Sequence, residues 1–171
     1  MAREDDEFAL IFGEIYPGLC RFLECLLGRE NVAQDIAQET FLRLYRLGTG
    51  ILPPEQARFW LFRVARNLAL NEISKRRTRQ RLWQRIEDVF QKQETNPGAE
   101  LEQREQGKRL LRWLQSLPEH QRAVLVLREQ EEMSYREIAR VLETSESKVK
   151  TDIFRARCAL RAKWREFESA S

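Results

Sequence analysis

The sequence contains few of the residues that build metal centres, disulfide frameworks or strand-rich folds. Its 171 residues include three cysteines, Cys20, Cys25 and Cys158, and one histidine, His120, and none of them has the spacing of a metal-ligand motif. Apolar β-branched residues do not alternate with polar ones, as they do in half-buried strands. These absences indicate reduced, packed thiols in a helical chain, and we expect no metal and no cofactor.

Long apolar runs are also missing. No stretch approaches the roughly 20 residues that span a bilayer, and the acidic start MAREDDE lacks the basic-then-apolar pattern of a secretory signal. We therefore expect a protein that stays in the cytoplasm. With 42% hydrophobic and 33% charged residues, the chain has the composition and length of one ordinary soluble domain or two small ones.

The charges that are present are sorted into blocks, although the net charge is only +3. Residues 58–85 carry nine Lys and Arg residues against one acid, Glu72, and residues 148–165 carry seven against Asp152. Acidic stretches precede and separate these two blocks. Two separate basic surfaces predict two contacts with one long polyanion.

A polar segment, residues 84–105, divides the chain. It is poor in periodic apolar residues and contains the turn signal Asn96-Pro97-Gly98, so it predicts a flexible linker. Helical spacing of apolar residues continues on both sides of it. The sequence therefore predicts an all-α fold with two small helical domains, residues 5–83 and residues 106–168.

The second domain contains two short helices with almost nothing between them, in SYREIARVLETSESKVKTDIFRAR, residues 134–157. Ser134 and Glu137 form a capping box before the first helix, and Thr144 or Ser145 can cap the second. The second helix has an apolar stripe at three- and four-residue spacing, which predicts its buried face. That stripe consists of Val149, Ile153, Ala156, Leu160 and Trp164.

The opposite face of this second helix is basic and rich in hydrogen-bonding groups. It carries Ser147, Lys148, Lys150, Thr151, Phe154 and Arg155. A solvated amphipathic helix would show similar charges, but a large aromatic residue on the polar face favours contact with a sugar, a base methyl or a partner protein. The pattern predicts a helix-turn-helix whose second helix enters the major groove of DNA.

In the first domain, a helix expected to be capped by Asn31 has a second face that water alone does not favour. This face mixes acidic and apolar side chains, namely Asp35, Gln38, Glu39, Phe41 and Leu42. A further helix could cover Phe41 and Leu42. Together with the two acids, these residues favour a protein docking face.

The next helix, expected from near Glu55, presents aromatic, arginine and asparagine side chains opposite its apolar stripe. Such a face suits unstacked single-stranded bases, because aromatic rings stack on any base and amides bond to its edges. The set is Phe59, Arg63, Arg66, Asn67 and Asn71, followed by Lys75, Arg76 and Arg77. Trp60, at the edge of the stripe, either belongs to the core or joins this set.

Three motifs in series resemble one family over nearly the whole chain, from about Phe8 to Leu160. They are DIAQETFLRLYR, FWLFRVARNLALNEISKRR and SLPEHQRAVLVLREQEEMSYREIARVLETSESKVKTDIFRARCALR. Their order and the linker length are similar to those of bacterial RNA polymerase sigma factors of the extracytoplasmic-function (ECF) group, in the sigma-70 family. The resemblance implies a sigma region 2 domain over residues 5–83 and a region 4 domain over residues 106–168.

The resemblance also implies a function, that of an alternative sigma factor in transcription initiation, linked to stress response and not an enzyme. The face around Asp35 would grip the clamp of the polymerase β′ subunit. The Arg63 helix would bind and open the minus-ten element, and the Lys148 helix would read the minus-thirty-five element. The implied partners are core RNA polymerase, through the β′ clamp and the β flap, promoter DNA, and an anti-sigma factor that can hold the protein near the membrane.

Three positions depart from the family pattern. Asn71 stands where Asp is common, Glu132 where Gly often occurs, and Asp152, at the flank of the reading face, where Arg is frequent. A rival interpretation is a helix-turn-helix regulator that does not bind polymerase. A nucleic-acid enzyme would need an acid-base cluster, for which a lone His120 is a poor candidate.

Overall fold

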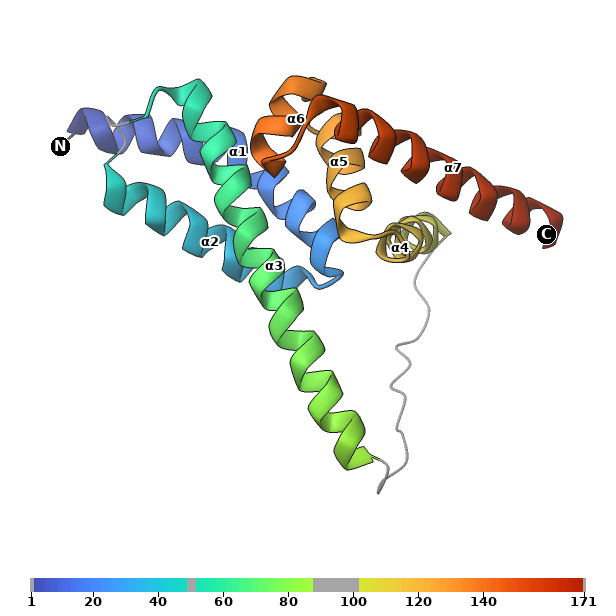
Figure 1. The fold of residues 1–171 in the computed structure, drawn as a ribbon. Helices are drawn as coiled ribbons and strands as arrows, with labels where there is room; N and C mark the ends of the chain where they lie inside the picture. The colour runs from blue at the N-terminus through green and yellow to red at the C-terminus, as the bar shows by residue number, and fades with distance from the viewer. Residues whose placement is uncertain (1, 49–51, 88–101, 171) are drawn as a thin grey trace.

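The computed structural model describes residues 2–48, 52–87 and 102–170, and every regular element in these ranges is an α-helix (Figure 1). The all-α prediction is therefore confirmed. Most of the expected linker, with its Asn-Pro-Gly turn, lies outside the described residues. The first half contains α1 (Ala2–Leu27), α2 (Glu30–Leu47) and α3 (Pro54–Glu87), and the second contains α4 (Glu102–Gln115), α5 (Glu119–Glu129), α6 (Tyr135–Leu142) and α7 (Glu146–Ala170).

The core of the first half lies where α1, α2 and α3 meet. Leu19, Phe22 and Leu23 of α1 are fully buried, and the Phe22 ring meets that of Phe62 in α3 edge to face, with centroids 5.4 Å apart. α1 continues through Pro17, although proline lacks the backbone N–H that a helix interior uses.

The start of α2 also differs from the prediction. The helix begins at Glu30 and its N-cap residue is Arg29, which makes no side-chain cap bond. Asn31 lies one residue inside the helix and is not its cap. Within the first turns of the helix, Gln34 Nε2 donates to Glu30 Oε1, at 3.1 Å.

The second half contains the predicted helix-turn-helix, α6 and α7. Ser134 Oγ accepts from the Glu137 backbone N–H at 3.3 Å, while the Glu137 carboxylate accepts from the Ser134 N–H at 2.6 Å, so the capping box is confirmed. Ser145 Oγ accepts from the Lys148 N–H at 3.2 Å, which identifies Ser145 as the side chain that caps α7. The helix pair is therefore fixed at both starts by short polar side chains.

The buried stripe of α7 ends earlier than the spacing predicts. Val149, Ile153 and Ala156 are buried, whereas Trp164 is 52% exposed. α7 extends beyond α5 and α6 at this end (Figure 1), and the Trp164 ring meets those of Trp113 in α4 and Phe167. Its predicted place in the core is wrong because these contacts leave about half of the side chain exposed.

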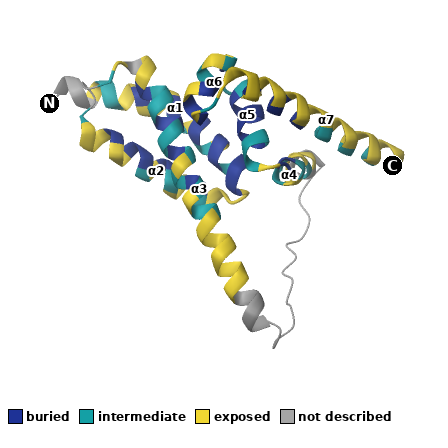
Figure 2. Cartoon of the chain, in the orientation of Figure 1, coloured by how far each residue is buried: buried dark blue, intermediate teal, exposed yellow. Residues whose placement is uncertain are grey.

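The two halves also pack on each other, α1 against α4 and α5, and α3 against α6. In contrast, α3 continues well past this contact, and Figure 2 shows the described part of this extension coloured as exposed. The first part of α3 thus lies between the two halves, while residues 74–82 project into solvent.

Candidate nucleic-acid and polymerase interfaces

The predicted reading face of α7 is exposed along its whole length. All six residues, Ser147, Lys148, Lys150, Thr151, Phe154 and Arg155, are exposed. Phe154 is 66% exposed, which is unusual for a large aromatic side chain that has no binding role. Thr151 Oγ1 donates to the Ser147 carbonyl at 3.0 Å, so its hydroxyl is held close to the helix. The face offers both hydroxyl and cationic groups to a ligand.

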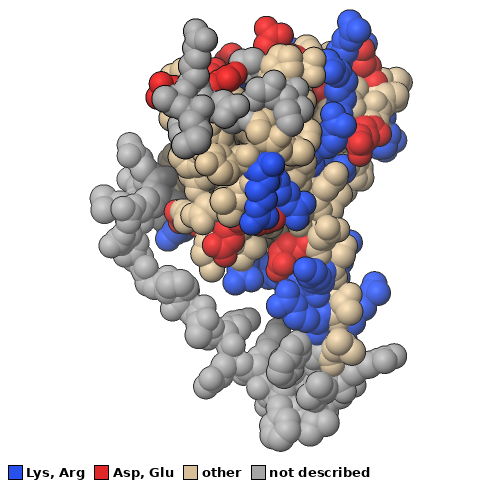
Figure 3. Space-filling view, turned by 90° about the vertical axis from the view of Figure 1, so that its left-hand side faces the viewer, with Lys and Arg blue, Asp and Glu red and all other residues tan. Residues whose placement is uncertain are grey.

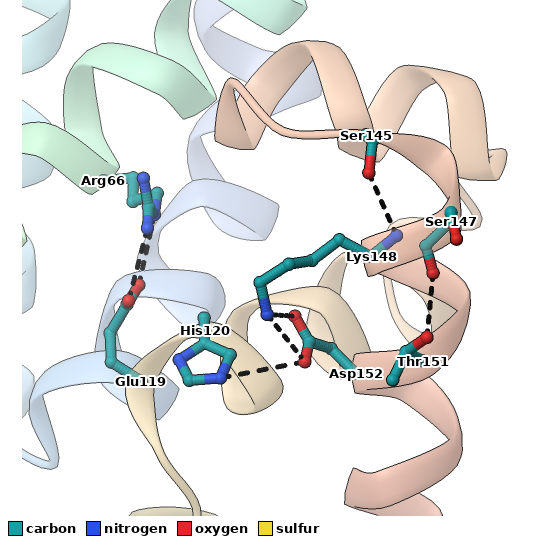
Figure 4. A network of polar contacts seen from close by, with 8 residues as sticks. All are labelled: Arg66, Glu119, His120, Ser145, Ser147, Lys148, Thr151 and Asp152. Carbon is teal, nitrogen blue, oxygen red and sulfur yellow. Dashed lines mark hydrogen bonds and ion pairs between the residues drawn. The ribbon is translucent and has the colours of Figure 1, made fainter.

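Asp152 lies in a different place from the one predicted. The sequence places it at the flank of the reading face, but its side chain is only 3% exposed. The carboxylate oxygens lie 3.1 and 2.8 Å from Lys148 Nζ, and Oδ1 lies 3.7 Å from His120 Nε2 on α5 (Figure 4). The sequence could not reveal the His120 contact, because it depends on how α5 crosses α7.

The predicted minus-ten face of α3 is partly covered by the second half of the chain. Arg66 makes two hydrogen bonds with Glu119 of α5, from Nε to Oε1 at 3.1 Å and from Nη2 to Oε2 at 3.3 Å (Figure 4). Arg63 Nη1 lies 3.8 Å from Glu143 Oε1. The Phe59 ring, half-buried, has the Arg140 guanidinium 5.4 Å from its centroid. Glutamates of the second half thus form ion pairs with the two arginines that we expect to bind DNA, Arg63 and Arg66.

The remaining residues of this predicted face divide into two groups. Trp60 is half-buried and packs against the core. It therefore contributes to the core while part of the residue remains accessible to a base. The side chains further along are exposed, namely Asn67, Asn71, Lys75, Arg76 and Arg77. The exposed end of α3 therefore keeps its cationic groups available to a ligand.

The charge distribution on the surface follows this division. Figure 3 shows one group of Lys and Arg low on the molecule, over the exposed end of α3, another down its upper right side and a smaller one near the middle of the face, with Asp and Glu among them. Such separated positive regions attract a polyanion by long-range electrostatics.

Two further contacts join the halves, and neither was predicted. Arg58 Nη2 donates to the Glu131 carbonyl at 2.7 Å and lies 3.4 Å from its carboxylate, which is also 3.7 Å from Arg21 Nη2. Arg122 of α5 is buried and donates to the carbonyls of Leu26 and Leu117 at 2.5 and 3.0 Å. Burial lowers the pKa of Arg122 below its ordinary value.

The predicted docking face on α2 is present with one exception. Asp35, Gln38 and Leu42 are exposed, and Glu39 accepts from Arg43 Nε at 2.8 Å. Phe41, however, is only 2% exposed. Its ring is surrounded by aromatic side chains of α1, at centroid distances of 6.1 Å to Phe8, 4.9 Å to Phe12 and 5.8 Å to Tyr16. Its predicted exposure is wrong because α1 covers that side of α2.

Two features are absent from the described ranges. None of their helices combines the length and the apolar character of a membrane span. Within the same ranges, no group of three or more His, Cys, Asp and Glu side chains is placed to hold a metal ion.

Two helical halves, one ending in a helix-turn-helix with an exposed basic face, define a two-domain helical protein of the DNA-binding type. Residues 11–79 match the family model for sigma-70 region 2, and residues 107–160 match the model for sigma-70 region 4. The chain belongs to the ECF RNA polymerase sigma factors of the sigma-70 family. It is therefore an alternative sigma factor for transcription initiation and not an enzyme, and a repressor without polymerase binding is not favoured.

Several characterised proteins are similar over most of their length. The chain is 30% identical to the ECF sigma factor SigW of Bacillus subtilis, over 95% of this chain and 91% of that protein. It is 28% identical to SigM of the same organism, over 92% of this chain and 93% of that protein.

Two solved structures share its fold. RpoE of Bartonella quintana, solved in complex with the anti-sigma factor NepR, has a TM-score of 0.69 at 22% identity, covering 92% of this chain and 96% of that one. CnrH, solved with the cytosolic domain of CnrY, has a TM-score of 0.67 at 24% identity, covering 93% and 88%.

Proposed function

We propose that this sigma factor binds core RNA polymerase through α2, binds and opens the minus-ten element with α3, and reads the minus-thirty-five element with α7. The observation that carries the proposal is the reading face of α7, where all six side chains selected from the sequence are exposed on one helix of a capped helix pair. The region 2 domain would span residues 5–83, the linker residues 84–105 and the region 4 domain residues 106–168, in agreement with the matched ranges.

The polymerase contact assigned to α2 rests on its exposed acids and Leu42, which is 49% exposed. An acidic surface with an apolar residue at its centre suits a partner that presents both basic and apolar side chains. We assign direct contact to Asp35, Gln38, Glu39 and Leu42. Buried Phe41 would not contact the polymerase directly, and would instead hold α2 in place by packing against α1.

A second polymerase contact is proposed at an apolar groove between α4, α5 and α7. The groove has a volume of about 350 Å³ and is lined by Leu110, Leu114, Leu125, Val126 and Leu160, with Glu129 and Arg157 at its edge. Leu110 is 48% exposed. This surface suits an apolar segment of the polymerase β flap, which would bury these side chains.

The test is co-elution of the purified chain with bacterial core RNA polymerase. We expect the wild type to co-elute with the polymerase. The Asp35→Ala, Glu39→Ala double variant should elute separately from it. The control is Glu166→Ala, Glu168→Ala, which removes the same charge from exposed positions at the far end of α7. Failure of the wild type to co-elute would contradict the proposal, and equal loss in the control would show a general charge effect instead.

We further propose that the closed arrangement of the two halves is a resting state. A promoter phosphate would compete with the Glu119 carboxylate for the Arg66 guanidinium, which now makes two hydrogen bonds to Glu119. Promoter binding would therefore replace the Arg66–Glu119 and Arg63–Glu143 contacts. The Glu119→Gln, Glu143→Gln variant should bind a promoter more tightly in complex with polymerase, and unchanged affinity would contradict this gating.

An anti-sigma factor would act on the same closed state. RpoE, which shares the fold, was solved with an anti-sigma factor, and CnrH, which also shares it, was solved with the cytosolic domain of CnrY. We propose that this sigma factor resides in the bacterial cytoplasm, where an anti-sigma factor retains it near the membrane until a signal arrives. Affinity capture from cells with and without stress would test this, and a chain that is always free would contradict it.

A further inference from the structure

The buried carboxylate of Asp152 connects the reading helix to α5. It receives the ammonium group of Lys148 at both oxygens, at 3.1 and 2.8 Å, and Oδ1 lies 3.7 Å from His120 Nε2 (Figure 4). Asp152 is 3% exposed, whereas Lys148 is 52% exposed. The charged end of a surface lysine is therefore held at one point by a group that solvent does not reach.

Lys148 cannot easily leave this position for a DNA phosphate. Its departure would strand a buried carboxylate, and an unpaired buried charge is strongly unfavourable. Among the described residues, the other ionic partner within 4 Å of Asp152 is His120, whose Nε2 lies 3.7 Å from Oδ1, too far for a hydrogen bond that would replace the lost ones. The pair is therefore expected to persist when α7 meets DNA.

The geometry also leaves one donor of Lys148 unused. An ammonium group has three N–H donors, and two of them are accounted for by the two oxygens of Asp152. Because Nζ is fixed, the third N–H can point in only a narrow range of directions. An acceptor at the floor of the major groove, such as O6 or N7 of guanine, suits a donor fixed in this way.

We propose that Asp152 is a positioning residue that converts Lys148 from a mobile phosphate-binding cation into a fixed donor to one base pair of the minus-thirty-five element. The proposal rests on the reading role proposed above for α7. It predicts that Lys148 contributes to sequence preference and little to the salt dependence of binding, because the Lys148–Asp152 pair has no net charge. Phosphate contacts would come from other cations of the face, such as Lys150 and Arg155.

The test compares holoenzymes that carry wild-type chain, Asp152→Asn, Lys148→Met and the double variant. The DNA probes are a duplex selected from a random library by the wild-type holoenzyme and a random-sequence duplex of equal length. For each, the affinity is measured against salt, and the selected duplex is also changed one base pair at a time within the minus-thirty-five element. Glu146→Gln is the matched control, since it removes one acid from the exposed start of α7 without releasing Lys148.

The proposal predicts a specific pattern. In Asp152→Asn the released Lys148 should bind a phosphate, so the salt slope on random duplex steepens by about 0.9, while discrimination at one base pair falls roughly tenfold. The double variant should lose the same discrimination but keep the wild-type slope, because the released cation is gone. Glu146→Gln should change neither quantity.

Two results would overturn the proposal, and a third would contradict the reading role of α7 on which it rests. An unchanged slope in Asp152→Asn, or a double variant whose slope stays as steep as that of Asp152→Asn, would show that Asp152 does not act through Lys148. If Asp152→Asn weakens the fold, the proposal is tested by comparing Lys148→Met with the double variant. Both lack the Lys148 ammonium group, so both should show equal discrimination between base pairs. A wild-type holoenzyme with no preference for the selected duplex would instead contradict the reading role of α7.

Discussion

Replacement of Arg122 should separate the two halves of the chain. Its guanidinium donates to the backbone carbonyls of Leu26 and Leu117 and to the side-chain oxygen of Gln115, at 2.5, 3.0 and 2.8 Å. The Leu26 carbonyl lies at the end of α1, where helix carbonyls lack partners within the helix. One side chain on α5 therefore satisfies acceptors in both halves.

The cost of Arg122→Ala follows from what it leaves behind. Two buried carbonyls lose a charged donor, at about 1–3 kcal/mol each, and the emptied volume adds to this loss. Against it stands the cost of burying the guanidinium, which the lowered pKa of Arg122 reflects. We expect a net loss of roughly 3 kcal/mol in the free energy of unfolding.

Urea unfolding followed by tryptophan fluorescence measures this loss. The wild type should unfold in one transition, and Arg122→Ala should show a lower midpoint and earlier exposure of the α1–α5 contact by hydrogen exchange. Arg128→Ala is the control, because Arg128 lies on the same helix and donates only locally, to the Met133 carbonyl at 2.8 Å. An Arg122→Ala midpoint equal to that of Arg128→Ala would refute the reasoning and show that water replaces the guanidinium.

Three smaller perturbations test other features. Glu132→Gly should raise the free energy of unfolding by about 0.5–1 kcal/mol, because Glu132 has a φ of 54° that only glycine adopts without strain, and an unchanged urea midpoint would contradict this. Ser134→Ala should cost about 1 kcal/mol through the lost cap. Bonds from Ser134 hold the pKa of Glu137 below its ordinary 4.5, so the stability that this carboxylate adds is present above pH 4.5 and is lost as the pH falls through the lower folded value. The backbone N–H of Ser134, the larger cause, is kept in the variant, so only the hydroxyl's share is lost and the variant should lose slightly less stability on acidification, as acid titrations of unfolding will show. Phe154→Ala should leave the thermal midpoint unchanged yet weaken promoter binding several-fold, and equal binding would remove Phe154 from the reading face.

The features predicted from the sequence are those that depend on neighbours along the chain. Ser134 and Glu137 form their capping box within one turn, and the exposed face of α7 follows from helical spacing alone. Phe41 and Asp152 were misplaced because α1 covers the first and α5 contacts the second. Helical spacing gives the direction of a side chain, whereas its burial depends on another helix that lies far away in the sequence.

The contacts between the halves could not be predicted for the same reason. Arg66 and Glu119 are separated by 53 positions, and each is an ordinary charged residue on its own helix. The sequence indicates that Arg66 is positioned to meet a polyanion, but not that a glutamate of the same chain holds it first. The unusual Glu132 was recognised as a departure, and the structure shows that it keeps the left-handed turn in spite of its side chain.

The projecting end of α3 behaves as a short polyelectrolyte rod. Over 34 residues the helix is about 50 Å long, and its exposed part carries Lys75, Arg77, Arg79 and Arg81, where like charges four residues apart repel each other. The pair formed by Arg79 and Glu72, at 3.3 Å, offsets only part of this repulsion. A polyanion or added salt would relieve the rest. The helical content of this segment should therefore rise with ionic strength. Circular dichroism measures helical content, and so it would report how strongly counterions screen the charges of α3.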